Sequence, residues 1–197
     1  MRAHRNSMRA AIAKAARLVL GDYAVYRLWV TDRPSKRTTD SSLNVRRVVH
    51  ADLDATDTDQ VLREAAWYFG NECDAFGCFD KNRLVGLACY WHGQRYRSRN
   101  SWPIEHRAAK LVHIVTVPSD RGKGVATLLI AESTSRMLQK GFCTLYARIW
   151  HSNRPSLSAF ARAGWRPYGW LLQANPLRRQ LPWTFRARVV GVSPRQT

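Results

Sequence analysis

Carboxylates are absent from the last third of this sequence. Glu132 is the final acidic residue, and residues 133–197 carry Arg and Lys but neither Asp nor Glu. Over the whole chain, 32 Lys and Arg residues stand against 14 Asp and Glu residues, which gives a net charge of +18. The imbalance excludes a carboxylate general base in the last third. It indicates either anionic partners or a merely solvated basic surface.

The four cysteines lack the spacing of a metal site. Cys73, Cys78, Cys89 and Cys143 form no C-x-x-C pair, and no pair of histidines stands at zinc-finger distance, so we expect no bound metal. Reduced cysteines are typical of a cytoplasmic protein, and this is the location that we expect.

No apolar run is long enough to cross a bilayer. The nearest candidate, residues 8–30, is interrupted by several charged side chains and lacks the uncharged core and cleavage site of a secretion signal. Within it, residues 8–20 place Ile12, Ala15 and Val19 on one stripe, which predicts a short helix. This helix would either cap the domain or lie peripherally on an anionic membrane surface.

The length fits either one domain with some decoration or one domain preceded by an arm. We assign residues 1–42 to the arm and residues 43–197 to the main domain. The arm would contain the basic helix, a strand over residues 23–30, and a polar, proline-containing linker over residues 32–42.

In the main domain, hydrophobic periodicity predicts alternating strands and helices. The expected strands are 43–49, 75–79, 84–91, 111–117 and 144–150, with one or two closing strands near Leu171 and in 183–190; the expected helices are 57–69, 122–139 and 153–164. Residues 80–82 have hairpin-turn chemistry, and 93–108 is expected to be a basic loop. This order indicates an α+β fold with a crossover through a helix from strand 111–117 to strand 144–150.

Two glycines between a buried strand and a long helix form the strongest motif. Gly122 and Gly124 lack the Cβ atoms that would keep a ligand away from the main chain. The first amides of a helix have no intrahelical partner and lie at its positive end, so they predict a pyrophosphate site, to which Arg121 and Lys123 add charge. The spacing excludes a Walker loop and the dinucleotide fingerprint. An ordinary helix start is the alternative.

Two blocks of sequence resemble the GNAT superfamily of acyltransferases. The first is R-x-x-G-x-A over residues 121–126, preceded by Pro118, which matches the family signature [QR]-x-x-G-x-[GA]. The second is N-x-x-S-L over residues 153–157, followed by Gly164-Trp165, which is similar to N-x-x-[AS]-[IL] and a later G-[FW]. One helix and one strand separate the blocks, as in the family. The resemblance covers about residues 43–190.

The resemblance implies a mixed central sheet with helices on both faces, in which strands 111–117 and 144–150 splay apart. Acetyl-CoA would be the cosubstrate, with its pantetheine arm along strand 111–117 and its thioester between the two strands. The resemblance assigns to the cofactor Val115, Val117, Arg121, Gly122, Lys123, Gly124, Val125, Ala126, Asn153, Ser156 and Phe160.

One residue of the family pattern is missing. Many members carry a tyrosine in the helix that follows this asparagine, where it protonates the leaving thiolate, but this chain has Phe160 there. We expect Phe160 to pack. Ser156 would then be the acid, or only a helix cap, or the thiolate would leave unaided, because thiols are weak bases at neutral pH.

Several residues are candidates for the general base. Some relatives have Glu on the strand that here carries Arg148. This arginine would face either a covering helix or the acceptor pocket, where it would favour a carboxylate or phosphate on the acceptor. His113, His151, Glu105 and His106 are the candidate bases, and an imidazole suits this task because its pKa lies near neutral pH. A water chain without a single base is the alternative.

These features give three hypotheses. The first is an acetyl-CoA-dependent N-acetyltransferase that acts on the primary amine of a small molecule, such as an amino sugar, by direct attack in a ternary complex. The second is acylation of a protein amine or an aminoacyl-tRNA, with the basic tail as the docking surface for nucleic acid. The third is a CoA-binding module without catalysis. A homodimer is compatible with each.

Overall fold

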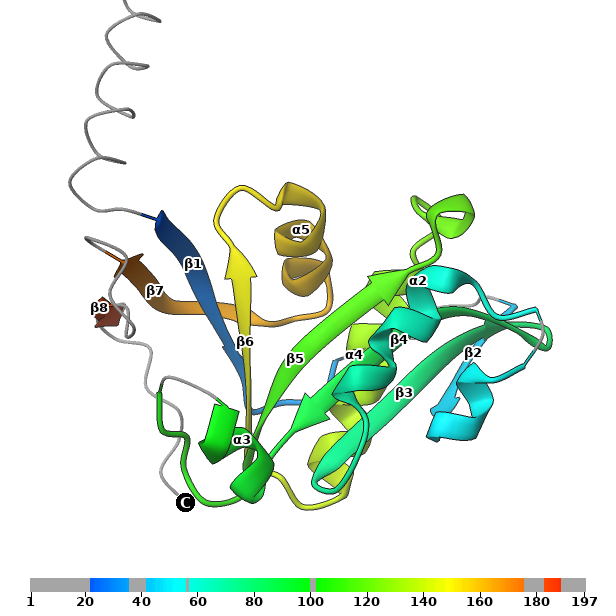
Figure 1. Ribbon diagram of the computed structural model, residues 1–197, viewed down its shortest axis with the longest axis horizontal. Coiled ribbons are helices and arrows are strands. Elements are labelled where there is room, and N and C mark those ends of the chain that lie inside the picture. Colours follow the sequence, from blue (N-terminus) through cyan, green and yellow to red (C-terminus); the bar gives the residue numbers. More distant parts are fainter. Residues whose placement is uncertain (1–21, 36–41, 56, 100–101, 176–182, 189–197) are drawn as a thin grey trace, which may run out of the picture.

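A single mixed sheet organises the chain. The computed structural model describes residues 22–35, 42–55, 57–99, 102–175 and 183–188, and its strands lie in the order β2-β3-β4-β5-β6-β1-β7-β8 (Figure 1). The strands are β1 (Asp22–Thr31), β2 (Leu43–Arg47), β3 (Cys73–Asp80), β4 (Arg83–Trp91), β5 (Ala108–Thr116), β6 (Thr144–Trp150), β7 (Arg166–Asn175) and β8 (Trp183–Arg188). Of the described pairs, β5–β6 is parallel and the others are antiparallel. The α+β class predicted from the sequence is confirmed.

Helices cover both faces of this sheet. They are α2 (Gln60–Arg63), α3 (Gly93–Arg99), α4 (Val125–Gln139) and α5 (Arg154–Arg162), with short 3₁₀ turns at His50–Leu53, Glu64–Tyr68 and Pro118–Asp120. The helices α4 and α5 pack together on one face, and α2 and α3 approach β5 from the other (Figure 1). The larger core lies under α4 and α5, and a second core lies under α2.

The hairpin and the crossover follow the sequence closely. The strands β3 and β4 pair up to Asp80 and Arg83, and the turn is closed by Lys81 with a positive φ of 54°. The crossover runs from β5 through α4 to the parallel strand β6, as the hydrophobic pattern predicts. The closing strands are longer than expected, because β7 begins directly after the Gly164-Trp165 pair.

Two helix predictions differ from the structure. The helix expected over 57–69 is a single α-turn, capped by the Asp59 carboxylate on the Val61 amide at 2.9 Å, and it continues as a 3₁₀ helix. The loop expected over 93–108 begins with the helix α3, which buries Tyr96 and donates the Tyr96 hydroxyl to the Trp102 carbonyl. Burial of one aromatic residue anchors this otherwise polar helix.

The strand assigned to the N-terminal arm belongs inside the sheet. Antiparallel ladders join β1 to β6 on one side and to β7 on the other, so the assignment of residues 23–30 to an arm is corrected. The apolar side chains of Leu28 and Val30 are fully buried there, which explains the β-branched and aromatic pattern of this strand. The expected helix 8–20 and most of the linker 32–42 lie outside the described residues.

No helix in the described part of the chain is long and apolar enough to cross a membrane.

Candidate functional site

The parallel strands β5 and β6 separate partway along their length. They pair from Ala108 opposite Thr144 to Leu111 opposite Ala147, and the register holds no pair beyond that point. A bulge in the β4–β5 ladder falls at the same place, since Cys89 pairs with His113 while Tyr90 pairs with Leu111. An extra residue bends a strand locally, so the bulge turns β5 away from β6. The splay implied by the family resemblance is present.

A cavity of about 190 Å³ occupies this fork. Its walls come from both splayed strands and from the start of α5, and comprise Leu111, Val112, His113, Ile114, Ala147, Arg148, Ile149, Trp150, Asn153, Ser156 and Phe160. The only side chain among them with a permanent charge is Arg148.

The turn before α4 presents free main-chain amides. Gly122 and Gly124 both have φ of +82°, which side-chain-bearing residues rarely adopt, and a Cβ at either position would meet no atom within 4 Å. Gly124 caps α4 without a side-chain hydrogen bond. None of the described residues accepts a hydrogen bond from the amides of residues 122–126. These amides therefore point their donors into open space at the positive end of a 15-residue helix.

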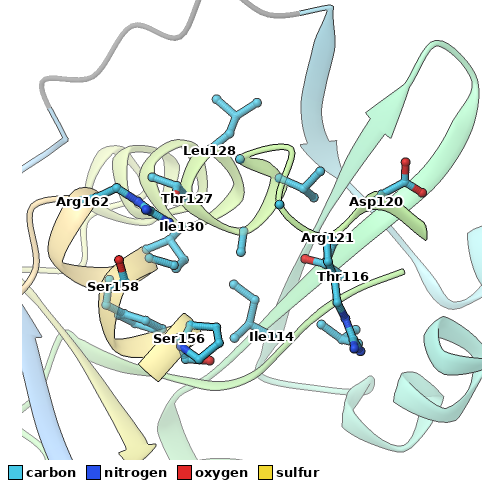
Figure 2. Close-up of a pocket in the computed structure, with 18 of the residues that line it drawn as sticks. Ile114, Thr116, Asp120, Arg121, Thr127, Leu128, Ile130, Ser156, Ser158 and Arg162 are labelled. Atoms are coloured by element: carbon cyan, nitrogen blue, oxygen red, sulfur yellow. The ribbon is translucent and has the colours of Figure 1, made fainter. Parts of the chain in front are cut away.

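A groove of about 910 Å³ leads from this turn into the protein. The strand β5 forms its floor, and the helices α4 and α5 form its walls. Figure 2 shows Ile114 and Thr116 of β5 on one side of the groove and Ser156 and Ser158 of α5 on the other. The groove and the fork cavity share Ile114, Asn153, Ser156 and Phe160. A continuous path thus runs from the uncapped amides to the point where β5 and β6 part.

The carboxylate nearest the turn is already neutralised. Asp120 is buried and accepts two hydrogen bonds from Arg83, at 2.9 and 3.1 Å, and one from Lys123 at 2.8 Å. The hydrogen bonds from Arg83 and then from Lys123 hold the pKa of Asp120 well below its ordinary value. An anion at the turn would therefore meet the amides and the exposed Arg121 rather than an uncompensated carboxylate.

Most residues assigned to the cofactor line this groove. Its walls include Val115, Arg121, Gly122, Gly124, Val125, Ala126, Asn153, Ser156 and Phe160. Lys123 is the first exception, because its ammonium group is held by Asp120 outside the lining.

Val117 is the second exception, because it lies outside the groove lining. Val117 is buried in the core under α2, its amide donates to the Val85 carbonyl at 2.9 Å, and its own carbonyl accepts from the Asp120 amide at 2.9 Å. Its main-chain N–H is thus used within the protein, and Val117 is not among the residues that line the groove.

His113 lies in the wall of the fork cavity. Its ring stacks on Tyr68 with centroids 4.2 Å apart, and its Nε2 atom is buried without a hydrogen-bond partner in the described part of the chain. Burial lowers the pKa of His113 below its ordinary value of 6.5. The imidazole is therefore neutral near pH 7 and has a vacant ring nitrogen, as a general base requires.

The other candidate bases lie elsewhere. Glu105 accepts a hydrogen bond from the Tyr146 hydroxyl at 2.8 Å, and His151 is exposed beyond β6 with Nδ1 3.2 Å from the Val25 carbonyl oxygen. Neither these two residues nor the exposed His106 line the groove or the fork cavity. The structure therefore does not bring Glu105, His106 or His151 to the fork.

The start of α5 places Ser156, Asn153 and Phe160 where groove and cavity meet. The Asn153 side chain caps α5 by accepting from the Ser156 amide at 3.2 Å, so the Ser156 hydroxyl is not the cap. Phe160 is 2% exposed and packs against Trp29 and Trp165, with centroids 6.3 and 5.0 Å away. The packing role expected for Phe160 agrees with these contacts.

Three residues near the fork were not found from the sequence. Tyr68 holds the His113 ring, Tyr26 lies 4.4 Å under the Arg148 guanidinium, and Lys110 is 3% exposed on the same face of the sheet. A lysine inside the apolar run of residues 108–117 was a usable signal, because a buried lysine is rare. The contacts of Tyr68 and Tyr26 depend on tertiary pairing that the sequence does not display.

Comparisons with known proteins agree with this geometry. The family model described as the acetyltransferase (GNAT) family matches residues 23–165. A GNAT-family protein from Novosphingobium aromaticivorans is 17% identical over 78% of this chain and 64% of its own, with a TM-score of 0.57. A tandem GNAT protein of the clavulanic acid pathway is 13% identical over 90% of this chain and 58% of its own, with a TM-score of 0.52.

An aminoglycoside N-acetyltransferase in complex with CoA is 18% identical over 61% of this chain and 90% of its own, with a TM-score of 0.46. A search of curated proteins gives no match. The chain spans less than two thirds of the length of the Novosphingobium and clavulanic acid pathway proteins. At their identities the Novosphingobium and clavulanic acid pathway structures show a shared fold, whereas the family match covers most of the sequence. The chain therefore belongs to the acetyltransferase (GNAT) family.

Proposed function

We propose that this protein is an acetyl-CoA-dependent N-acetyltransferase that acts on the primary amine of a small molecule. The observation that carries the proposal is the continuous path from the free amides of residues 122–126 to the fork between β5 and β6. The diphosphate of CoA would bind at the amides, because a helix N-terminus with unpaired donors is an anion site. Membership of the GNAT family supports an acyl-CoA as cosubstrate.

The pantetheine arm would follow the free edge of β5. Beyond Leu111 this strand pairs with β4 on one side and has no strand partner on the other within the described sheet. A free strand edge binds an extended chain through main-chain hydrogen bonds, and the two amides of pantetheine are such a chain. The thioester would then enter the fork cavity beside Ser156 and Phe160.

The reaction would be a direct transfer. The amine nitrogen attacks the thioester carbonyl carbon, the new C–N bond forms, the C–S bond breaks, and the thiolate of CoA leaves. His113 would accept the proton that the amine loses, since its pKa is lowered by burial and it lines the fork. The thiolate would take a proton from water, either directly or through the Ser156 hydroxyl, which would regain its proton from that water, because Phe160 has none to give. Main-chain donors at the free edge would polarise the carbonyl.

A ligand titration followed by turnover tests this function. We expect acetyl-CoA and CoA to raise the melting temperature, and ADP to raise it less, because ADP lacks the pantetheine arm that the groove would bury. Incubation with acetyl-CoA and a panel of primary amines should then release free thiol. Equal stabilisation by ADP and CoA would contradict the placement of pantetheine along β5. Stabilisation by acetyl-CoA without thiol release on any amine would indicate a binding module instead.

A further inference from the structure

Arg148 stands at the fork of the two strands. It is the first residue of β6 after the last pair with β5, and it alternates along the strand with Ala147 and Ile149, whose side chains lie in the core under α4 and α5. The Arg148 side chain therefore lies on the opposite face, where it lines the fork cavity.

The guanidinium of Arg148 is held in place but not neutralised. It stacks over the Tyr26 ring at 4.4 Å and donates one hydrogen bond, at 3.4 Å, to the Gln173 side-chain oxygen. None of the described carboxylates forms an ion pair with it. A guanidinium has five donors in a planar fork, so most of its hydrogen-bonding capacity remains open toward the cavity.

A second basic residue lies on the same face. Lys110 is 3% exposed, and its ammonium group lies 4.0 Å from the centroid of the Trp102 ring. Burial lowers the pKa of Lys110 well below its ordinary value, and the charge of Arg148 lowers it further, so the two groups are close enough to interact. Lys110 therefore adds no fixed charge, and Arg148 is the permanent positive charge in the lining of the fork cavity.

We propose that the acceptor is a primary amine that also carries an oxyanion, a carboxylate or a phosphate, and that Arg148 binds this oxyanion. The inference rests on the proposed function and specifies its acceptor. A planar oxyanion can take two parallel hydrogen bonds from a guanidinium, and the aromatic face of Tyr26 fixes the orientation of that guanidinium. A polycationic amine, by contrast, would place uncompensated positive charge beside Arg148.

Matched pairs of amines test the inference. The pairs are an amino acid with its carboxamide, over several side chains, and glucosamine 6-phosphate with glucosamine; kanamycin serves as the polycation. Thiol release from acetyl-CoA gives kcat/KM for each. We expect the anionic member of at least one pair to be preferred by about 10- to 100-fold, as for a charge-assisted hydrogen bond. Preference for the carboxylate pairs or for the phosphate pair identifies the oxyanion.

Two variants assign that preference to Arg148. Arg148→Gln should remove the preference for the anionic amine. Its kcat/KM should fall by about 10- to 100-fold on the anionic amine and by less than about 3-fold on the neutral partner. Arg148→Lys should keep part of the preference. Arg136→Gln is the control, because Arg136 lies on the exposed side of α4 near β2, far from the fork. This variant also removes one positive charge, but it should leave the preference for the anionic amine unchanged. Acetyl-CoA must stabilise each variant as it does the wild type, which confirms folding.

The outcomes separate the two proposals. If acetyl-CoA does not bind or no amine releases thiol, the proposed function fails. If thiol is released but neutral amines or kanamycin are preferred, only the anionic-acceptor inference is overturned. An equal loss on both members of a pair in Arg148→Gln would also overturn it, because a merely structural role for Arg148 affects all acceptors alike.

Discussion

A glutamate at Gly124 should weaken CoA binding without unfolding the protein. Gly124 has φ of +82° and open space around its Cβ position, so a new Cβ atom clashes with nothing, and the backbone strain is about 1–2 kcal/mol. Gly164, at the end of α5, has φ of +83° and equally open surroundings but does not line the groove. The Gly164→Glu variant is therefore a matched control, with the same added charge and a similar strain.

The expected loss follows from Coulomb's law. A carboxylate about 5 Å from one diphosphate charge costs about 0.8 kcal/mol in water and about 3 kcal/mol at an effective dielectric constant of about 20. We therefore expect Gly124→Glu to weaken CoA binding by about 10- to 100-fold relative to Gly164→Glu.

Isothermal titration calorimetry at 50 mM and at 500 mM salt measures both variants. The ratio of their Kd values should shrink at the higher ionic strength, because salt screens the repulsion between exposed charges. Equal Kd values for the two variants would refute the placement of the diphosphate at the turn before α4.

Three further predictions concern the fork and the core. His113→Gln should lower kcat by about 100- to 10,000-fold. Because burial lowers the pKa of His113, the activity of the wild type should stay level down to pH 6.5 and fall only below that pH. A fall in activity centred above pH 6.5 would exclude His113 as the base. Phe160→Ala should cost about 3–5 kcal/mol of unfolding free energy in urea, since Phe160 is 2% exposed; a cost below about 1 kcal/mol would contradict its core role. Asp74→Asn should cost about 1–3 kcal/mol at pH 7. Burial opposes ionisation of Asp74, but hydrogen bonds from His92 and Lys140 outweigh it and lower its pKa from 3.8 to about 2. The stability from this lowered pKa is present above pH 3.8 and is lost as the pH falls toward 2, so the gap between wild type and variant should narrow over that range in urea unfolding. A gap independent of pH would contradict the ion-pair account.

Local signals in the sequence were sufficient for the glycine turn before α4. Glycines 122 and 124 mark a turn whose conformation depends on a few neighbouring residues, and the hairpin at Asp80-Lys81-Asn82 is equally local. Both features follow from backbone preferences that each residue carries by itself. The structure therefore agrees with the sequence prediction at these places.

Features that depend on distant pairing were missed. Nothing in residues 22–31 indicates that β1 inserts between β6 and β7, because the partners are more than a hundred residues away in the chain. For the same reason, the alternation of Tyr146, Arg148 and Trp150 indicated that the three side chains share one face of the strand. It did not indicate whether that face is covered by a helix or lines the acceptor pocket. The bulge opposite Cys89 and Tyr90, which puts Val117 in the core, also has no local signal.

Amide chemical shifts test the central claim most directly. In a ¹⁵N-labelled sample, addition of CoA should move the amide resonances of Gly122, Gly124 and Ala126 downfield, because an N–H that donates to a phosphate oxygen is deshielded. The amide of Gly164 should stay unchanged. If CoA binds while the resonances of residues 122–126 keep their positions, the diphosphate does not lie on these amides and the account of the site is wrong.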